Sequence, residues 1–114
     1  MSAPDLPSVP AAELPSDTTE PLILLDVRED DEWQQGHAPG AVHIPMSEIP
    51  SRLGEIDIDS QLYVVCKGGG RSARVVEYLN QIGYDAVNVD GGMAAWQSAG
   101  RPLVRDDGAE ARIF

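Results

Sequence analysis

Short apolar runs alternate along the chain with segments whose apolar residues recur at helical spacing. Residues 22–25 and 62–66 are apolar without polar alternation, which predicts parallel strands buried on both faces. Three further stretches predict the remaining strands, at residues 8–9, 41–45 and 86–89. Strands that alternate with helices imply a parallel sheet, joined by right-handed crossovers and covered by helices on both faces. The pattern therefore predicts an α/β fold.

A helix of about three turns is predicted from Ser72 to just before Gly83, a residue type that suits the position after a helix end. The apolar residues that recur at helical spacing in this segment are Val75, Val76, Leu79 and Ile82. Further helical segments are expected at residues 10–14, at residues 46–53, and from Met93 until the glycine and proline that follow it. These helices supply the crossovers between the predicted strands.

The length of 114 residues suits one domain with a proper hydrophobic core. We expect residues 1–7 to be a flexible segment, residues 8–103 to form the domain, and residues 104–114 to be a charged C-terminal tail. The start of the chain shows no secretory signal pattern, and no apolar run approaches the roughly 20 residues that span a bilayer. The single cysteine leaves no intramolecular disulfide, so we expect a soluble, cytoplasmic protein.

The formal charge of the chain is −11, from 19 acidic residues against 8 lysines and arginines. An acidic protein repels nucleic acid and anionic membranes, so we expect neither as a partner. Because cations are scarce, their positions are informative, and Lys67, Arg71 and Arg74 lie within eight residues of one another. This cluster predicts a local anion site, although Arg74 could equally point to solvent from the first helical turn.

The cations surround the only cysteine, at the junction of a predicted strand and a predicted helix. The candidate site is the loop formed by Cys66, Lys67, Gly68, Gly69, Gly70, Arg71 and Ser72. Three consecutive glycines allow positive φ and leave the inside of the turn free, so backbone N–H groups can surround a small anion above the sulfur. The helix N-terminus and the charges of Lys67 and Arg71 favour the thiolate form of Cys66. We therefore predict that Cys66 is a reactive nucleophile.

Two simpler interpretations explain less of this loop. A lone cysteine is most often a small buried hydrophobic residue, which accounts for the strand but not for three glycines followed by Arg71 and Ser72. A phosphate cradle would need the spacing Gly-x-x-x-x-Gly-Lys-Ser/Thr, which is absent, and Lys67 precedes the glycines. A reactive thiolate in an anion-binding loop accounts for all of these residues.

Three residues outside the loop are candidates for supporting roles, namely Asp26, Arg28 and His37. Asp26 lies three residues before Glu29, the spacing of a helix-capping box, and we favour this role over catalysis. Arg28 could pair with Asp26 or face the site, and pairing is the simpler expectation. His37 is conceivable as a general base for Cys66, but a turn histidine that satisfies backbone groups is the simpler expectation. Two histidines and one cysteine lack the spacing of a zinc site, so we assign no metal and no cofactor.

Together these residues resemble the single-domain rhodaneses, a family of sulfurtransferases, from about residue 9 to residue 102. The motifs that carry the resemblance are LDVRE at residues 25–29, GHAPGAVHIP at residues 36–45, CKGGGRS at residues 66–72 and GGMAAW at residues 91–96, followed by Gly100 and Pro102. The resemblance implies a five-stranded parallel sheet in the order 3-2-4-5-1, with the cysteine strand in the centre. It also assigns the nucleophile role to Cys66 and a six-residue active loop to Cys66 through Arg71.

The reaction implied by the resemblance is a two-step sulfur transfer. The Cys66 thiolate attacks the outer sulfur of thiosulfate, a small anionic donor, and sulfite leaves. The sulfur then passes from the Cys66 persulfide to cyanide, a thiol or a protein acceptor. Backbone N–H groups of the loop would stabilise the anionic sulfite and persulfide, while Lys67 and Arg71 would offset the charge of the donor.

Two other functions within this fold stay open. Cysteine-dependent phosphatases share the rhodanese-like fold, but their signature has five residues between cysteine and arginine, whereas four lie between Cys66 and Arg71. The smaller loop should suit one sulfur atom and crowd a tetrahedral phosphate. A non-catalytic binding or regulatory module would most often lack the cysteine, and Cys66 is present. We therefore expect an enzyme, a thiosulfate sulfurtransferase.

Overall fold

The computed structural model describes residues 6–15 and 22–113. Within these ranges the strands are β1 (Ser8–Pro10), β2 (Leu22–Asp26), β3 (Val42–His43), β4 (Gln61–Val65) and β5 (Asp85–Asp90). The α-helices are α1 (Asp30–Gln35), α2 (Gly70–Gln81) and α3 (Gly92–Ser98), and the 3₁₀ helices are η1 (Ala11–Glu13), η2 (Met46–Glu48) and η3 (Pro50–Glu55). The expected flexible segment 1–7 falls mostly outside the described residues, and so does the last residue of the expected C-terminal tail.

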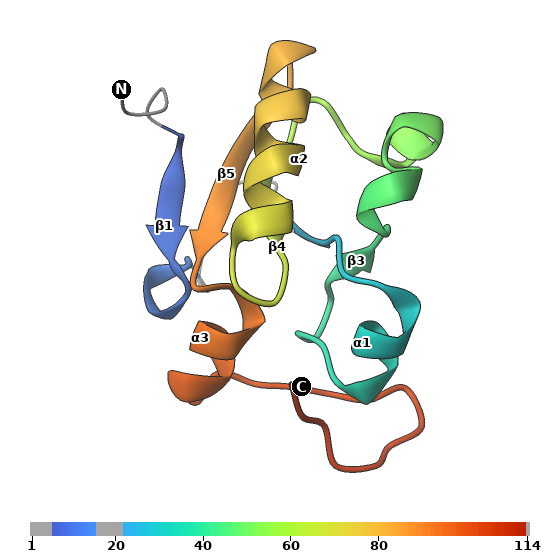
Figure 1. Ribbon diagram of the computed structural model, residues 1–114, viewed down its shortest axis with the longest axis vertical. Helices are drawn as coiled ribbons and strands as arrows, with labels where there is room; N and C mark the ends of the chain where they lie inside the picture. Colours follow the sequence, from blue (N-terminus) through green and yellow to red (C-terminus); the bar gives the residue numbers. More distant parts are fainter. Residues whose placement is uncertain (1–5, 16–21, 114) are drawn as a thin grey trace.

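The strands form one parallel sheet in the order β1-β5-β4-β2-β3. Read from its other edge, this is the order 3-2-4-5-1, so the fold prediction is confirmed. Figure 1 shows that α1, α3 and the start of α2 all lie at the carboxyl ends of the strands. Because β4 lies between β2 and β5, its carboxyl end opens into the middle of this edge of the sheet.

Two clusters of buried apolar side chains hold helices against opposite faces of the sheet. One cluster includes Val75, Val76 and Leu79 from α2 with Leu62 and Val64 from β4. The other includes Met93 and Trp96 from α3 with Val65 from β4 and Val89 from β5. Neighbouring residues of a strand point to opposite faces, so Val64 and Val65 enter different clusters. Burial on both faces explains why these strands are apolar without polar alternation.

The first α-helix is capped by Glu29, so the expected capping role of Asp26 was wrong. The Glu29 side chain accepts a hydrogen bond from the backbone N–H of Glu32, and the Glu29 N–H donates to Glu32 Oε1 at 3.0 Å, which completes a capping box. Asp26 is instead the last residue of β2 and is fully buried, where its carboxylate binds Arg28. The sheet therefore extends one residue beyond the apolar run, and the helix begins at Asp30.

Two other local expectations differ from the structure. Residues 46–53 were expected to form one helix, but the chain forms the two 3₁₀ helices η2 and η3 there. Pro50 lacks an N–H to continue the first turn, and Arg52 departs from helical geometry with φ −119° and ψ 20°. Ile82 was expected on the buried face of α2, yet it follows the helix and is 42% exposed. The buried stripe of α2 therefore ends at Leu79.

The segment after α3 returns across the carboxyl side of the sheet and packs against α1, as Figure 1 shows along the lower border of the molecule. Val104 forms an antiparallel bridge with His37, with N–H···O distances of 3.0 and 2.8 Å. Further along, the N–H of Arg112 donates to the carbonyl of Gln35 at 2.9 Å. Gly36 lies against the backbone of Arg112 so closely that a Cβ atom would not fit. Residues 104–113 are therefore attached to the folded unit by backbone contacts.

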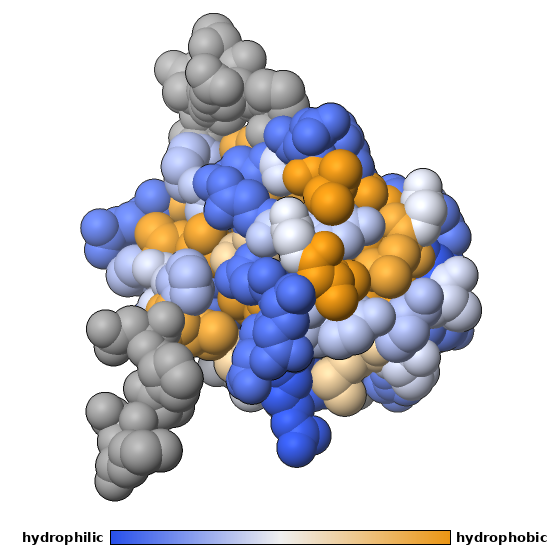
Figure 2. Space-filling view, turned by 90° about the horizontal axis from the view of Figure 1, so that it is seen from above, coloured by the Kyte–Doolittle hydropathy of each residue, from blue (hydrophilic) through white to orange (hydrophobic). Residues whose placement is uncertain are grey.

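The surface carries scattered apolar side chains. Figure 2, which views the amino ends of the strands, shows apolar groups separated by hydrophilic ones. The large hydrophobic residues that are exposed in the described ranges are Val42, Ile58, Ile82 and Val104. Scattered exposure of this kind is ordinary for a protein surface. Every helix within residues 6–15 and 22–113 is too short or too polar to cross a membrane.

Candidate active site

Cys66 lies at the carboxyl end of β4, immediately before the loop that leads into α2. The residue is only 1% exposed, but polar groups surround its sulfur. The N–H of Gly69 donates to Sγ at 3.0 Å, and Ser72 Oγ lies 3.3 Å from Sγ. Gly69 has a φ of 113°, a conformation that only glycine adopts without strain. The loop therefore closes over Cys66 with backbone N–H groups directed toward the sulfur.

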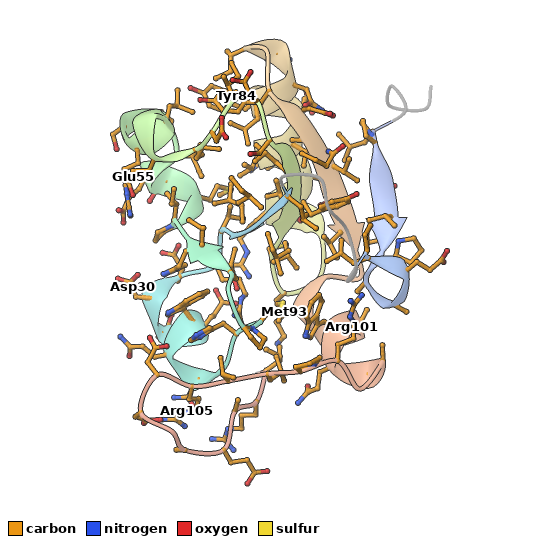
Figure 3. All side chains as sticks on the ribbon, turned by 180° about the vertical axis from the view of Figure 1, so that it is seen from behind. Asp30, Glu55, Tyr84, Met93, Arg101 and Arg105 are labelled. Carbon is orange, nitrogen blue, oxygen red and sulfur yellow. The ribbon has the colours of Figure 1, made fainter. Side chains whose placement is uncertain are left out.

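The start of α3 holds this loop from its other side. The N–H of Met93 donates to the carbonyl of Cys66 at 2.7 Å, and the N–H of Ala94 donates to the carbonyl of Lys67 at 3.0 Å. Figure 3 shows Met93 where α3 begins, at the carboxyl edge of the sheet. A Cβ atom on Gly92 would overlap the carbonyl oxygens of Cys66 and Lys67, so this approach requires glycine. Two helix starts thus meet at the loop.

Hydrogen bonds and burial have opposing effects on the ionisation of Cys66. Burial is the largest single influence and raises the pKa of the thiol, because the charged sulfur loses contact with water. The hydroxyl of Ser72 and the backbone N–H groups of Ser72, Gly69 and Gly68 act in the other direction. Together they outweigh burial and hold the pKa of Cys66 below its ordinary value. A lowered pKa is what a cysteine nucleophile needs near neutral pH.

Ser72 is held beneath the loop by Asn88, a residue that the sequence analysis did not single out. Ser72 Oγ donates to Asn88 Oδ1 at 2.5 Å, and Asn88 Nδ2 donates to the carbonyl of Gly69 at 3.4 Å. Both Ser72 and Asn88 are buried. The available signal was a polar residue within an otherwise apolar strand, because a buried amide requires hydrogen-bond partners.

Arg71 forms an ion pair with a carboxylate of α1. Its guanidinium donates two hydrogen bonds to Glu32, at 2.6 and 2.9 Å. These bonds are the main reason that the pKa of Glu32 is lowered to about 2, and they raise the pKa of Arg71. Lys67, by contrast, is exposed and pairs with no carboxylate in the described ranges. Of the two loop cations expected to bind an anion, Lys67 is therefore the one whose charge is not already neutralised.

Comparison with known proteins identifies the family of this fold and loop. A family model described as a rhodanese-like domain matches residues 10–99. The chain belongs to the rhodanese-like family. This rhodanese-like chain is 45% identical to YtwF of Bacillus subtilis over 83 residues, which span 73% of the chain and 81% of that protein. It is 41% identical to a sulfurtransferase of Allochromatium vinosum over 91 residues, which span 79% of the chain and 85% of that protein.

Solved structures give the same answer for the fold. The rhodanese-like chain resembles the crystal structure of a rhodanese-related protein from Thermoplasma volcanium with a TM-score of 0.79 and 36% sequence identity. The match covers 86% of this chain and 97% of that one. The similarity therefore extends over nearly the whole of that structure.

Arg28 and Asp26 form a buried ion pair in this rhodanese-like domain. Arg28 Nη2 lies 2.8 Å from Asp26 Oδ2 and donates to the carbonyl of Gly36 at 2.7 Å. Arg28 also reaches the carbonyl of Glu32 at 3.4 Å. The pair therefore joins the end of β2 to both ends of α1 and supports the helix that carries Glu32. These contacts are structural, and they involve none of the loop residues.

His37 is buried beside α1, and its contacts are those of a structural histidine. Its ring stacks on Trp33 with a centroid distance of 3.5 Å, and His43 stacks on Trp33 at 4.6 Å. His37 Nδ1 lies 2.9 Å from the Trp33 carbonyl oxygen, and Nε2 lies 3.1 Å from the carboxylate of Asp106. Both ring nitrogens are thus occupied by groups other than Cys66.

Proposed function

We propose that this protein is a sulfurtransferase that carries a sulfur atom on Cys66. The observation that supports this most directly is the position of Cys66 Sγ, 3.0 Å from the N–H of Gly69 beneath a loop whose hydrogen bonds lower its pKa. Membership of the rhodanese-like family and similarity to a sulfurtransferase point in the same direction. A buried cysteine with only a packing role would gain nothing from such a loop.

In the first half-reaction, the Cys66 thiolate attacks the outer sulfur of thiosulfate or of a related anionic donor. A bond forms between Sγ and that sulfur while the S–S bond of the donor breaks. The electron pair of the broken bond leaves on sulfite, so the step needs no external oxidant or reductant. The product is an anionic persulfide on Cys66, whose outer sulfur lies where the loop N–H groups stabilise negative charge.

In the second half-reaction, a nucleophile attacks the outer sulfur of the persulfide. The acceptor is cyanide, a low-molecular-weight thiol or a thiol of another protein. The bond between Sγ and the outer sulfur breaks, and its electron pair returns to Sγ as the Cys66 thiolate. A thiol with a lowered pKa is a good leaving group, so the hydrogen bonds that activate Cys66 for attack also favour its release.

Lys67 supplies the charge that an anionic donor needs in a protein of net charge −11. Its exposed position on the loop lets the ammonium group meet the donor at the entrance, while the donor sulfur approaches Cys66. Arg71 contributes less, because Glu32 already neutralises it. The loop has four residues between Cys66 and Arg71, which suits a single sulfur atom better than a phosphate group.

Intact-protein mass spectrometry tests this proposal. Thiosulfate should add one sulfur atom to the wild-type protein, cyanide should remove it as thiocyanate, and Cys66→Ala should show neither change. An aryl phosphate is assayed in parallel. Turnover of the phosphate without sulfur uptake would favour a phosphatase. A wild-type protein that takes sulfur neither from thiosulfate nor from a small persulfide would be a binding module and would overturn the proposal.

A further inference from the structure

The hydroxyl of Ser72 lies among acceptors that compete for its single hydrogen. Ser72 Oγ is 2.5 Å from Asn88 Oδ1, 3.2 Å from the carbonyl oxygen of Gly69 and 3.3 Å from Cys66 Sγ. A serine hydroxyl has one hydrogen to donate, while its lone pairs accept. Asn88 provides the shortest contact, so the hydrogen points to Asn88 and a lone pair is left for Sγ.

This orientation fits the neutral thiol. The S–H of Cys66 donates to Ser72 Oγ, and the O–H of Ser72 donates to Asn88, so two hydrogen bonds form a chain that ends on the amide oxygen. The thiolate has no hydrogen, and the hydroxyl of Ser72 can stabilise it only by turning its O–H toward Sγ. Asn88 Oδ1 then loses its donor. Asn88 is 4% exposed, so water compensates this loss poorly and ionisation of Cys66 carries a cost that depends on Asn88.

We propose that Asn88 is a positioning residue that controls, through the Ser72 hydroxyl, whether the sulfur of Cys66 is held as a free thiolate or in an uncharged form. The thiol is one uncharged form. The persulfide, whose formation rests on the proposed function, is the other, because its Sγ is bonded to a second sulfur that carries the charge. In the persulfide the loop N–H groups bind the outer sulfur, and the Ser72 hydrogen returns to Asn88.

Few charged groups complicate this interpretation. Arg71 acts electrostatically on Cys66 but is paired with Glu32 from α1. Lys67 in the loop, Arg74 on α2 and Asp90 at the end of β5 are exposed. Helix α3 (Gly92–Ser98) brings no titratable side chain to the loop. A neutral substitution at Asn88 leaves all of these charges in place, so it removes only the hydrogen bonds of the amide, to the Ser72 hydroxyl and to the carbonyl of Gly69.

The test measures the rate of Cys66 alkylation against pH. Asn88→Leu keeps the approximate size of the side chain and removes the amide oxygen, so we expect the Cys66 pKa to fall by about half to one unit. Ser72→Ala removes the hydroxyl that stabilises the thiolate, so the pKa should rise by a similar amount. In the Ser72→Ala background, Asn88→Leu should have no further effect, because the link between Asn88 and Cys66 is already absent.

Asn80→Leu is the matched control. Asn80 also uses both ends of its amide to bind β5, at 2.8 and 3.0 Å from the backbone of Ala86, but it makes no contact with Ser72. Asn80→Leu should therefore lower stability without changing the Cys66 pKa measured by alkylation. Asn88→Ala removes the same oxygen without added bulk and replaces Asn88→Leu if that variant does not fold. The proposal is overturned if the Cys66 pKa is unchanged or raised in the Asn88 variants. It is also overturned if that pKa falls equally with and without the Ser72 hydroxyl.

The persulfide form of the protein gives a second measurement. At a constant ratio of thiosulfate to sulfite, Asn88→Leu should lower the ratio of persulfide to free Cys66 by about fivefold, because the thiolate is favoured over the persulfide. The two levels of inference fail separately. If the wild-type protein takes up no sulfur, the proposed function is wrong and the alkylation result still decides the role of Asn88. If the wild-type protein takes up sulfur but Cys66 has the same pKa in Asn88→Leu as in the wild type, the proposed function stands and this inference is wrong.

Discussion

Arg71 and Glu32 form a two-point ion pair that joins the loop over Cys66 to the start of α1. The residues are 39 positions apart in the chain, and their paired atoms are 2.6 and 2.9 Å apart. Glu32 also accepts the N–H of Glu29 and so completes the capping box of the helix. One carboxylate therefore holds a helix start and the loop together. It also neutralises Arg71, which leaves the exposed Lys67 to meet an incoming anion.

Glu32→Gln should lower the free energy of unfolding by about 1–2 kcal/mol near neutral pH, a value reduced for the partial exposure of Arg71. The pKa of Glu32 is about 2 in the folded protein against an ordinary 4.5. Because the pKa of Glu32 is lower in the folded protein than in the unfolded chain, the ionised carboxylate stabilises the fold at pH values above about 4.5. This contribution is lost as pH falls from about 4.5 toward 2. Denaturant titrations of both proteins should therefore show a stability difference that shrinks over this range.

The exposed pair of Arg52 and Glu55 provides the control for that prediction. It has the same two-point geometry, at 2.8 and 2.9 Å, but both side chains reach solvent. Glu55→Gln should therefore change stability less than Glu32→Gln does. A stability difference for Glu32→Gln that is independent of pH down to about 2 would show that the ion pair contributes nothing.

Gly92→Ala should destabilise the protein by about 2–4 kcal/mol and slow sulfur uptake, because the new methyl group would push the loop away from α3. Gly92 combines a positive φ of 58° with close contact to the carbonyls of Cys66 and Lys67. Gly108 has a φ of 78° with open space around its Cα, so Gly108→Ala isolates the backbone strain alone at about 1 kcal/mol. Thermal unfolding of the two variants checks this order, and equal losses would contradict the contact.

Lys67→Ala should raise KM for thiosulfate about three- to tenfold at low ionic strength while kcat stays similar, because the charge acts on binding of the donor. The difference from wild type should shrink as salt is added. Arg74→Ala removes an equal charge one helical turn beyond the loop and should have a smaller effect. Steady-state kinetics over a range of salt concentrations decide this, and identical KM values for wild type and Lys67→Ala would remove Lys67 from the site.

Alkylation of Cys66 should follow a titration with a midpoint below the free-cysteine pKa of about 8.5, because the loop hydrogen bonds lower the pKa of this thiol. The residue is 1% exposed, so a small reagent should react much faster than a bulky one with the same leaving group. Mass spectrometry of samples quenched at a series of pH values measures both effects. A midpoint at or above the free-cysteine value would contradict the activation described above.

Features confined to neighbouring residues were predictable from the sequence. Residues 62–66 indicated a buried strand, and the glycines after Cys66 indicated a loop with inward N–H groups. The spacing of apolar residues indicated the helix that follows. The error at Asp26 has the same origin, because a capping box is defined by a spacing of three and Glu29 and Glu32 satisfy it equally well. Spacing alone does not show which of two overlapping boxes forms.

The sequence by itself determined the strands, most of the helices and the place of Cys66 at the end of a buried strand, since periodicity and turn chemistry act over a few residues. Only the tertiary structure decided which groups reach that cysteine and its loop: Asn88 through Ser72, Glu32 through Arg71, and the start of α3 through Gly92. These partners come from different strands and helices. Packing of α1, α3 and β5 around the carboxyl end of β4 brings them together, and local patterns along the chain carry no information about that packing.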